Sequence, residues 1–377
     1  MTGTLVVTND FPPRPGGIQA FVHALCRGLG DEVAVYAPAW RGAADFDREQ
    51  PFPVVRHPTS LMLPTPGVLG RARRAAREHK CASVLYGAAA PLGLLTRGLR
   101  AAGVGRAVAL THGHETGWAR LPGARALLRR IGDDVDVVTY VGEYTRGRIA
   151  PALSDAAAAR MAWLAPGVDL DAFRPDAGGA AMRDRLGLAD RPVVVCVSRL
   201  VPRKGQDTLI RAWPAVRRAV PDATLLLVGG GPSRDRLRRL ADATGVADAV
   251  VFTGSVPWRE LPAHFDAGDV FAMPCRTRAG GLDVEALGIV FLEAAACGLP
   301  VVAGDSGGSR DAVRDGETGY VVDGRSPDTV AERLVALLRD RELAAAMGAR
   351  GRAWVEREWG WDRVVARLRE LLRVPQA

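Results

Sequence analysis

Short apolar runs alternate with longer segments of helical periodicity along the whole chain. This alternation is typical of parallel sheets that are covered by helices. The apolar runs that predict strands are residues 4–8, 33–37, 84–86, 108–111, 137–141, 193–198, 223–228, 250–253, 270–273 and 301–303. The pattern restarts near residue 190, after a loop rich in proline, glycine and aspartate. We therefore predict an α/β protein of two doubly wound, Rossmann-like domains. A linker around residues 166–190 joins them, and a ligand cleft lies between the carboxyl ends of their sheets.

Composition excludes several classes of protein. The chain has 377 residues, of which 48% are hydrophobic and 24% charged, so disorder is excluded. Its five cysteines are scattered without C-x-x-C spacing, which argues against a disulfide framework or a zinc site. The first residues lack the basic region of a signal peptide. The longest apolar stretch, residues 286–304, contains Glu293 and Pro300 and does not predict a membrane span.

The net charge of +8 is concentrated in the first part of the chain. Residues 1–168 carry 20 basic and 13 acidic side chains, whereas residues 169–377 carry 30 and 29. Two segments predicted to be helices, 70–80 and 120–130, hold much of the excess. Their candidate membrane-binding residues are Arg71, Arg73, Arg74, Arg77, Lys80, Arg125, Arg129 and Arg130. Such segments form either a solvated helical face or a contact with an anionic membrane. Nucleic acid is disfavoured because no aromatic residues interleave the arginines.

Lysine is rare in this chain, which draws attention to Lys204. The sequence contains 48 arginines but only two lysines, Lys80 and Lys204. Arg199 and Lys204 follow a predicted strand and precede a helix, so two cations stand five residues apart at a strand end. A guanidinium and a compact ammonium suit a diphosphate. The alternative is a pair of ordinary surface cations.

The segment 283–293 carries two carboxylates at a distinctive spacing. Glu285 and Glu293 are eight residues apart, and Glu293 is expected to open a helix of small residues. Gly288 allows the backbone N–H groups of Ile289 and Val290 to point at a phosphate. The two carboxylates are candidates to hold sugar hydroxyls, one on a transferred sugar and one on a ribose. A buried core acid is the alternative for each.

Glycines and histidines mark two strand ends of the first domain. Gly16 and Gly17 lie between the first strand and a helix, where backbone N–H groups can approach a substrate. The loop lacks G-x-G-x-x-G spacing, which disfavours nicotinamide binding. His112 follows another strand and is a candidate ligand of a sugar hydroxyl, with His114 as a second choice; alone, a strand-end histidine bonded to the backbone would be favoured.

Two Asp-x-Asp patterns do not predict a metal site. One is Asp134 with Asp136, which leads into a strand, and the other is Asp169 with Asp171, which lies in the linker. Because Arg199 and Lys204 can neutralise a diphosphate, we expect no metal and no cofactor.

Together these motifs resemble the retaining glycosyltransferases of family four, which have the two-domain GT-B fold. The resemblance covers nearly the whole chain, through the Pro15-Gly16-Gly17 loop, His112, Arg199 with Lys204, and the E-x7-E pair. Within that family, residues 7–19, 111–118 and 273–285 look most like the phosphatidylinositol mannosyltransferases of actinobacteria. Two departures lie near the expected donor site: Ser309-Arg310-Asp311 stands where relatives often carry Ala-Pro-Glu, and Ala286 stands where glycine is common.

The resemblance implies a donor, an acceptor and a place of action. The donor is GDP-mannose, and the acceptor is a phosphatidylinositol mannoside that receives its second mannose in α-1,6 linkage with anomeric retention. The enzyme would be peripheral on the cytoplasmic face of the plasma membrane. Residues 1–168 would form the acceptor- and membrane-facing domain and residues 169–357 the nucleotide-sugar domain. Residues 358–377 would form a helix that packs back on the first domain.

The resemblance also implies roles for residues. Arg199 and Lys204 would hold the diphosphate, Glu285 and His112 the mannose, and Glu293 the ribose. The catalytic residues would be Arg199, Lys204, Glu285 and His112. The donor-binding residues would be Gly16, Gly17, His112, His114, Arg199, Lys204, Glu285, Gly288, Ile289, Val290 and Glu293. Other hypotheses are transfer from UDP-glucose or UDP-GlcNAc to a small soluble acceptor, a nucleotide-sugar epimerase, and a non-catalytic nucleotide-sugar sensor.

Overall fold

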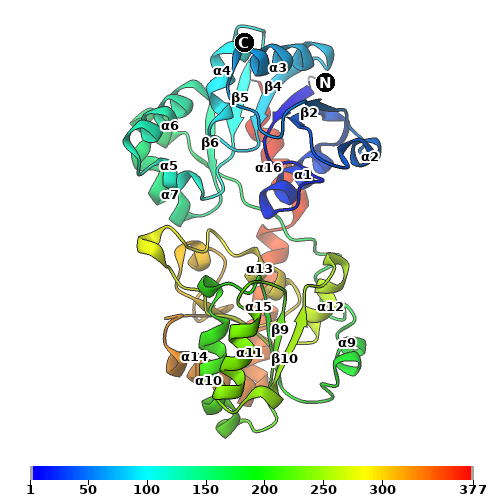
Figure 1. Ribbon diagram of the computed structural model, residues 1–377, viewed down its shortest axis with the longest axis vertical. Coiled ribbons are helices and arrows are strands. Elements are labelled where there is room, and N and C mark those ends of the chain that lie inside the picture. Colours follow the sequence, from blue (N-terminus) through cyan, green and yellow to red (C-terminus); the bar gives the residue numbers. More distant parts are fainter. Residues whose placement is uncertain (1–2, 375–377) are drawn as a thin grey trace. The chain divides into compact units, whose positions relative to one another are not determined.

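The computed structural model describes residues 3–374 and divides the chain into two compact units (Figure 1). The first unit runs to Pro166 and takes in the chain again from Trp361, and the second is Gly167–Gly360. Within the described residues, each unit has one sheet in which all paired strands are parallel. The predicted pair of doubly wound α/β folds is confirmed.

The sheet of the first unit has the strand order β3-β2-β1-β4-β5-β6-β7. Its strands are β1 (Gly3–Val7), β2 (Val33–Pro38), β3 (Val54–His57), β4 (Cys81–Tyr86), β5 (Arg106–Ala109), β6 (Val137–Tyr140) and β7 (Ala162–Trp163). Its helices are α1 (Gly17–Leu29), α2 (Ala43–Arg48), α3 (Pro66–Glu78), α4 (Thr96–Arg100), α5 (Glu115–Trp118), α6 (Pro122–Asp134), α7 (Glu143–Ile149), α8 (Asp155–Ala159) and α16 (Trp361–Leu372), with 3-10 turns η1 (Gly30–Glu32), η2 (Leu92–Leu95) and η3 (Ala150–Ala152).

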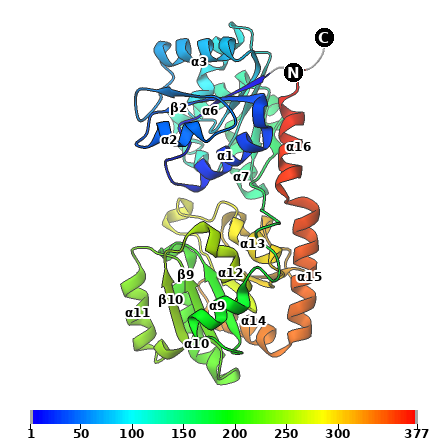
Figure 2. The same cartoon turned by 90° about the vertical axis from the view of Figure 1, so that its right-hand side faces the viewer.

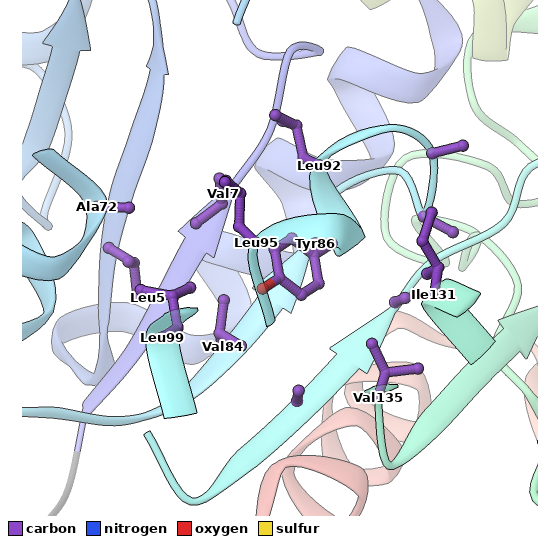
Figure 3. Packing of buried hydrophobic residues seen from close by; sticks show 14 of the residues in the cluster. Leu5, Val7, Ala72, Val84, Tyr86, Leu92, Leu95, Leu99, Ile131 and Val135 are labelled. Atoms are coloured by element: carbon purple, nitrogen blue, oxygen red, sulfur yellow. The ribbon is translucent and has the colours of Figure 1, made fainter. Parts of the chain in front are cut away.

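Helices α3, α4 and α6 cover one face of this sheet. Figure 3 shows their side chains Ala72, Leu99 and Ile131 in one cluster with strand residues that include Val84 and Tyr86. Helix α3 begins where the Thr65 hydroxyl accepts the Val68 N–H, with Pro66 at the first helical position. The two arginine-rich segments predicted to be helices are therefore confirmed as α3 and α6, and both belong to the same layer of the unit.

Helices α1 and α16 cover the opposite face. Val364, Val365, Leu368 and Leu372 of α16 are buried in the second core cluster. A Cβ atom on Gly28 would lie 2.2 Å from Val365 Cγ2, so this glycine allows α16 to approach α1 closely. The terminal helix thus packs on the first unit (Figure 2). It begins at Trp361 rather than at residue 358, because α15 continues to Glu358.

The sheet of the second unit has the order β10-β9-β8-β11-β12-β13. Its strands are β8 (Val193–Val197), β9 (Thr224–Val228), β10 (Val250–Gly254), β11 (Val270–Met273), β12 (Val301–Gly304) and β13 (Gly319–Val322). Its helices are α9 (Gly179–Leu186), α10 (Gln206–Ala219), α11 (Arg234–Ala243), α12 (Leu261–Asp266), α13 (Ile289–Ala296), α14 (Pro327–Arg339) and α15 (Arg341–Glu358), with η4 (Pro202–Lys204), η5 (Ala247–Ala249), η6 (Trp258–Glu260), η7 (Ala279–Gly281) and η8 (Gly307–Asp311).

The sequence did not predict three of the strands, and it predicted a linker where the structure has part of the second unit. Strands β3, β7 and β13 carry several half-buried residues and lack the long apolar runs of the inner strands. From Gly167 onward, the segment predicted as a linker belongs to the second unit. It contains α9, and Phe173 packs edge-on against Phe265 at 5.6 Å between ring centroids.

Candidate functional site

The strand order of the second unit reverses between β8 and β11. In open parallel sheets, ligands bind beyond the carboxyl ends of the strands at such a reversal. The segment after β8 is residues 198–205 and includes η4; the segment after β11 is residues 274–288. They touch at Gly205, whose φ is +77° and where a Cβ atom would lie 1.9 Å from the Pro274 carbonyl oxygen. Only glycine permits this approach.

Lys204 and Glu285 meet at this place. Lys204 Nζ lies 2.6 Å from Glu285 Oε2, and the two side chains are 11% and 10% exposed. The Glu285 backbone is fixed as well, because its carbonyl accepts the Gly308 N–H at 2.8 Å. Two residues singled out 81 positions apart in the sequence therefore form one buried ion pair.

A second cation beside this pair is Arg203, which the sequence analysis missed. Its guanidinium lies 3.4 Å from Asp283 Oδ1 and 3.9 Å from Glu285 Oε2. Arg199 is exposed. The adjacency of Arg203 to Lys204 in a 3-10 turn was the available signal, because consecutive residues of a tight turn can both face a neighbouring loop.

Helix α13 begins earlier than predicted. It starts at Ile289, so Glu293 lies within the helix rather than opening it. The cause is Gly288, which has φ +87° and where a Cβ atom would lie 2.5 Å from the Phe291 ring. The N–H groups of Ile289 and Val290 fall in the first helical turn, where backbone donors have no partner within the helix. That helix start favours an anion.

Glu293 has a perturbed acidity. Burial raises the pKa of its carboxyl to about 7, because a carboxylate in a poorly hydrated place is less stable than the acid. Near neutral pH this group can either accept hydrogen bonds as a carboxylate or donate one as an acid.

One of the two departures from the family pattern has a structural role. The buried Ser309 Oγ donates to the Gly304 carbonyl at 2.7 Å and accepts the Ser306 N–H at 3.1 Å. Arg310, beside it, forms an exposed ion pair with Asp305. This turn holds the end of β12 close to the backbone of Glu285, because Gly307 and Gly308 both pack against the segment 284–287.

In the first unit, His112 lies at the end of β5. Its Nε2 is 2.6 Å from the Gly87 carbonyl oxygen, which can only accept, so Nε2 carries the proton. Burial lowers the pKa of His112, against an opposing effect of Glu115. The ring is therefore neutral near pH 7 and its Nδ1 is an acceptor. This matches both readings from the sequence, a backbone-bonded histidine and a ligand of a hydroxyl.

Glu115 and His114 surround that ring. Glu115 is buried, and its Oε2 accepts the His112 backbone N–H at 2.9 Å. His114 Nε2 lies 3.2 Å from Glu115 Oε1, and the two histidine rings are stacked with centroids 6.1 Å apart. Glu115 thus holds both histidines, a role that the sequence analysis did not assign.

The Pro15-Gly16-Gly17 loop leads into α1 as expected. A Cβ atom on Gly17 would meet nothing within 4 Å, so the backbone there is open to a ligand. Gln19 Nε2 donates to Asp10 Oδ1 at 2.8 Å and ties the helix start to the end of β1.

Three aspartates of the two Asp-x-Asp patterns, Asp134, Asp136 and Asp169, have structural partners. Asp134 and Asp136 pair with Arg97 and Arg100, each at 2.8 Å, and Asp169 accepts the Asp171 N–H. Within residues 3–374, no group of three or more His, Cys, Asp or Glu side chains could hold a metal ion.

The arginine-rich helices present most of their charge to solvent. Arg73 is half-buried and donates to the Gly98 carbonyl at 2.9 Å. The other candidates are exposed, namely Arg71, Arg74, Arg77, Lys80, Arg125, Arg129 and Arg130. Leu61, Leu63, Leu121 and Leu127, next to or within the same helices, are also exposed. Over the described part of the chain, every helix is too short or too polar to cross a bilayer.

Known proteins resemble the chain over its whole length. Residues 15–172 match the model of Glycosyltransferase Family 4, and residues 180–354 match that of Glycosyl transferases group 1. The GDP-mannose-dependent alpha-(1-6)-phosphatidylinositol monomannoside mannosyltransferase of Mycobacterium tuberculosis is 55% identical, with 99% of this chain and 98% of the relative covered. The enzyme of the same name from Mycolicibacterium smegmatis is 56% identical over 98% and 97%.

Solved structures agree on the fold. The Anabaena HepE protein in complex with UDP has a TM-score of 0.84 at 20% identity, covering 98% of this chain and 99% of its own. WaaG, a glycosyltransferase of lipopolysaccharide biosynthesis, has a TM-score of 0.68 at 18% identity, covering 99% and 100%. The GT-B fold expected from the sequence is therefore confirmed. On the family models and the full-length relatives together, the chain belongs to the family 4 glycosyltransferases, among the phosphatidylinositol monomannoside mannosyltransferases.

Proposed function

We propose that this chain transfers mannose from GDP-mannose to phosphatidylinositol monomannoside, in α-1,6 linkage and with retention at the anomeric carbon. The observation that carries the proposal is the buried pair of Lys204 and Glu285 at the strand reversal of the second unit, beside the glycine-capped start of α13. A sugar diphosphate requires a cation and backbone N–H donors for its phosphates and a carboxylate for its sugar hydroxyls. The names of the mycobacterial relatives supply the sugar and the acceptor.

Each side chain has a role in this proposal. Lys204 and Arg199 hold the diphosphate, and the N–H groups of Ile289 and Val290 bind its oxygens. Glu285 accepts hydroxyls of the mannose. Arg203 balances the charge of Glu285 when the Lys204 ammonium turns to the phosphate, because it already lies 3.9 Å from the same oxygen.

Glu293 accepts the ribose hydroxyls in this proposal. A carboxylate can accept two adjacent hydroxyls at once, and the proton that Glu293 carries near its pKa of about 7 leaves when the nucleotide binds.

The reaction needs no nucleophile from the protein. The bond between the mannose C1 and the phosphate oxygen breaks, and its electron pair stays on the phosphate. The acceptor hydroxyl oxygen attacks C1 from the same face, and its proton passes to the leaving phosphate oxygen. Lys204 stabilises the growing negative charge on that phosphate, and such electrostatic stabilisation is usually the largest single contribution to catalysis.

In this proposal the first unit binds the acceptor and also contacts the transferred mannose. His112, a neutral ring that accepts through Nδ1, receives a hydrogen bond from the mannose C6 hydroxyl, with His114 as the adjacent polar group. Gly16 and Gly17 are proposed to approach the phosphates and the acceptor, and the open space at Gly17, where a Cβ atom would meet nothing within 4 Å, supports this.

We further propose that the enzyme is peripheral on the inner face of the plasma membrane. Helices α3 and α6 lie in one layer. Seven of the eight candidate cations are exposed on these helices, if Lys80, just after α3, is included. Exposed leucines lie next to or within the same helices. Basic side chains attract anionic lipid headgroups, and leucines enter the interface. Arg74→Glu with Arg77→Glu should weaken flotation with vesicles that contain phosphatidylinositol, and so should high salt. Binding that ignores both changes would contradict membrane docking.

A donor panel tests the reaction itself. The purified protein is incubated with GDP-mannose, GDP-glucose, UDP-glucose and UDP-GlcNAc, with phosphatidylinositol monomannoside as acceptor, and the products are identified by mass spectrometry and linkage analysis. We expect turnover with GDP-mannose alone. We expect loss of turnover in Glu285→Gln and Lys204→Ala at a temperature where both variants, although less stable, are still folded. Arg310→Ala, an exposed site nearby, is the matched control. Transfer from a UDP-sugar, or full activity of both variants, would overturn the proposal.

A further inference from the structure

Two segments carry the ion pair of the donor site, and a second polar network outside the pair joins them. One segment is η4 with the start of α10, and the other is the loop that leaves β11. At the centre of the network is Asp207, in the first turn of α10 and three residues after Lys204. Its carboxylate is 7% exposed, and Arg276, three residues after β11, is 15% exposed.

Arg276 holds both segments at once. Its Nη2 donates to both carboxylate oxygens of Asp207 at 2.9 Å, and its Nη1 donates to Thr208 Oγ1 at 2.9 Å. Its backbone N–H donates to the Arg203 carbonyl at 2.8 Å. The guanidinium thus grips the start of α10, while the main chain of the same residue grips the turn that carries Lys204.

The network extends outward from Arg276 in both directions. Thr208 Oγ1 in turn donates to the Gly324 carbonyl at 2.8 Å. On the loop side, Thr277 Oγ1 lies 3.1 Å from Ser306 Oγ, and that hydroxyl is 3.4 Å from the Glu285 backbone nitrogen. The loop is therefore anchored at its beginning by Arg276 and at its end by the backbone of Glu285.

Asp207 has two arginine partners, which differ in burial and in the segment that carries them. Arg211 also donates to Asp207 at 2.9 Å, but its side chain is 46% exposed and lies on the same helix one turn on. Burial alone would raise the pKa of Asp207, yet the hydrogen bonds from Arg276 and Arg211 lower it, so the carboxylate is charged. Of its two arginines at hydrogen-bonding distance, only Arg276 comes from the loop that carries Glu285.

We propose that Asp207 and Arg276 are positioning residues that set the distance between the Lys204 ammonium and the Glu285 carboxylate. The planar guanidinium fork holds the Asp207 carboxylate through Nη2 and the Thr208 hydroxyl through Nη1, which fixes both distance and angle as a single contact does not. Neither residue contacts the reacting atoms; each acts through the segment that it holds. This inference rests on the proposed function, since it assigns a purpose to the geometry of that donor site.

Kinetics of variants separate positioning from simple support of the fold. We expect Arg276→Gln and Asp207→Asn to lower kcat tenfold or more, with KM for the donor changed less than threefold. Arg276→Lys keeps the charge but not the fork, and it should stay closer to Arg276→Gln than to the unchanged protein. The double variant Asp207→Asn with Arg276→Gln should be no slower than the worse single variant, because the same contact between Asp207 and Arg276 is lost in all three variants. Arg211→Ala is the matched control and should keep kcat within twofold.

Hydrogen–deuterium exchange supplies a readout that needs no turnover. Exchange of residues 276–283 should accelerate in Arg276→Gln and Asp207→Asn, with exchange in α14 unchanged, and it should not accelerate in Arg211→Ala. This result is meaningful even if the unchanged protein transfers a different sugar, so failure of the proposed function is distinguishable from failure of this inference. The inference is overturned if Arg276→Gln keeps kcat within twofold, if Arg276→Lys restores it, or if loop exchange is unchanged.

Discussion

Removing the ammonium of Lys204 should lower the free energy of unfolding of the second unit, by an amount set by the burial of its ion pair with Glu285. Lys204→Met keeps a side chain of similar length but leaves the Glu285 carboxylate, 10% exposed, without its partner at 2.6 Å. Breaking a buried ion pair costs about 3–5 kcal/mol. We expect the lower value, about 3 kcal/mol, because Arg203 remains 3.9 Å from the same oxygen.

The stranded charge, rather than lost packing, is the predicted cause. Glu285→Gln alone leaves the ammonium buried and should be destabilising as well. The double variant Lys204→Met with Glu285→Gln contains no buried charge at either position, so it should be more stable than the sum of the two single effects predicts. Calorimetry at pH 7 measures this. In a unit of this size, 3 kcal/mol corresponds to a fall in Tm of roughly 6–12 °C.

An exposed ion pair provides the matched control. Arg310 lies 2.6 Å from Asp305, but the side chains are 58% and 47% exposed. Such pairs contribute about 0–1 kcal/mol, so Arg310→Ala should move Tm by at most roughly 2–4 °C. The reasoning fails if Lys204→Met has an effect as small as this control, or if the double variant shows the plain sum of the two single losses.

Three further predictions concern single residues. Because the carboxyl pKa of Glu293 is raised to about 7 in the folded protein, the folded state keeps a proton that the unfolded chain has lost; stability should therefore fall as pH rises from about 4.5 to about 7. Glu293→Gln removes this loss, so its Tm should exceed that of the unchanged protein at pH 8 but not at pH 4, and equal gaps at both would refute the assignment. Gly288→Ala forces a Cβ atom to 2.5 Å from the Phe291 ring at φ +87°, which should cost about 1–3 kcal/mol and weaken GDP binding in calorimetry; unchanged affinity would argue against a phosphate at the α13 start. Glu115→Gln should lower kcat because Glu115 holds the His112 backbone at 2.9 Å, whereas Glu143→Gln, on an exposed helix start, should not; equal rates for the two variants would contradict the role of Glu115.

Much of the fold follows from the sequence because the inner strands are short, almost entirely apolar runs. Strands β8, β9 and β11 are buried along their entire length and read as short apolar runs, and the candidates Lys204 and Glu285 follow β8 and β11. Lys204 and Glu285 were both singled out in advance, and topology explains why they meet. A strand order that reverses between β8 and β11 brings together the two segments that follow those strands.

The parts that sequence reasoning missed depend on contacts between distant residues. Nothing near Asp207 in the sequence indicates Arg276, because their pairing arises only when β8 and β11 become neighbours. Arg203, in contrast to Arg276, is next to Lys204 in the sequence, but the prediction paired Lys204 with Arg199 instead. The start of α13 was misplaced because the φ of Gly288, not the small residues after Glu293, determines where the helix begins.

Helix α16 has a consequence for how the chain is made. It supplies Val364, Val365, Leu368 and Leu372 to the core of the first unit, whose other residues are all synthesised before residue 167. On the ribosome, the first unit therefore waits with an uncovered apolar face while the whole of Gly167–Gly360 emerges and can fold. Loss of the last turns of α16 would remove Leu368 and Leu372 from that core. Residues that follow the second unit in the chain thus complete the core of the first unit.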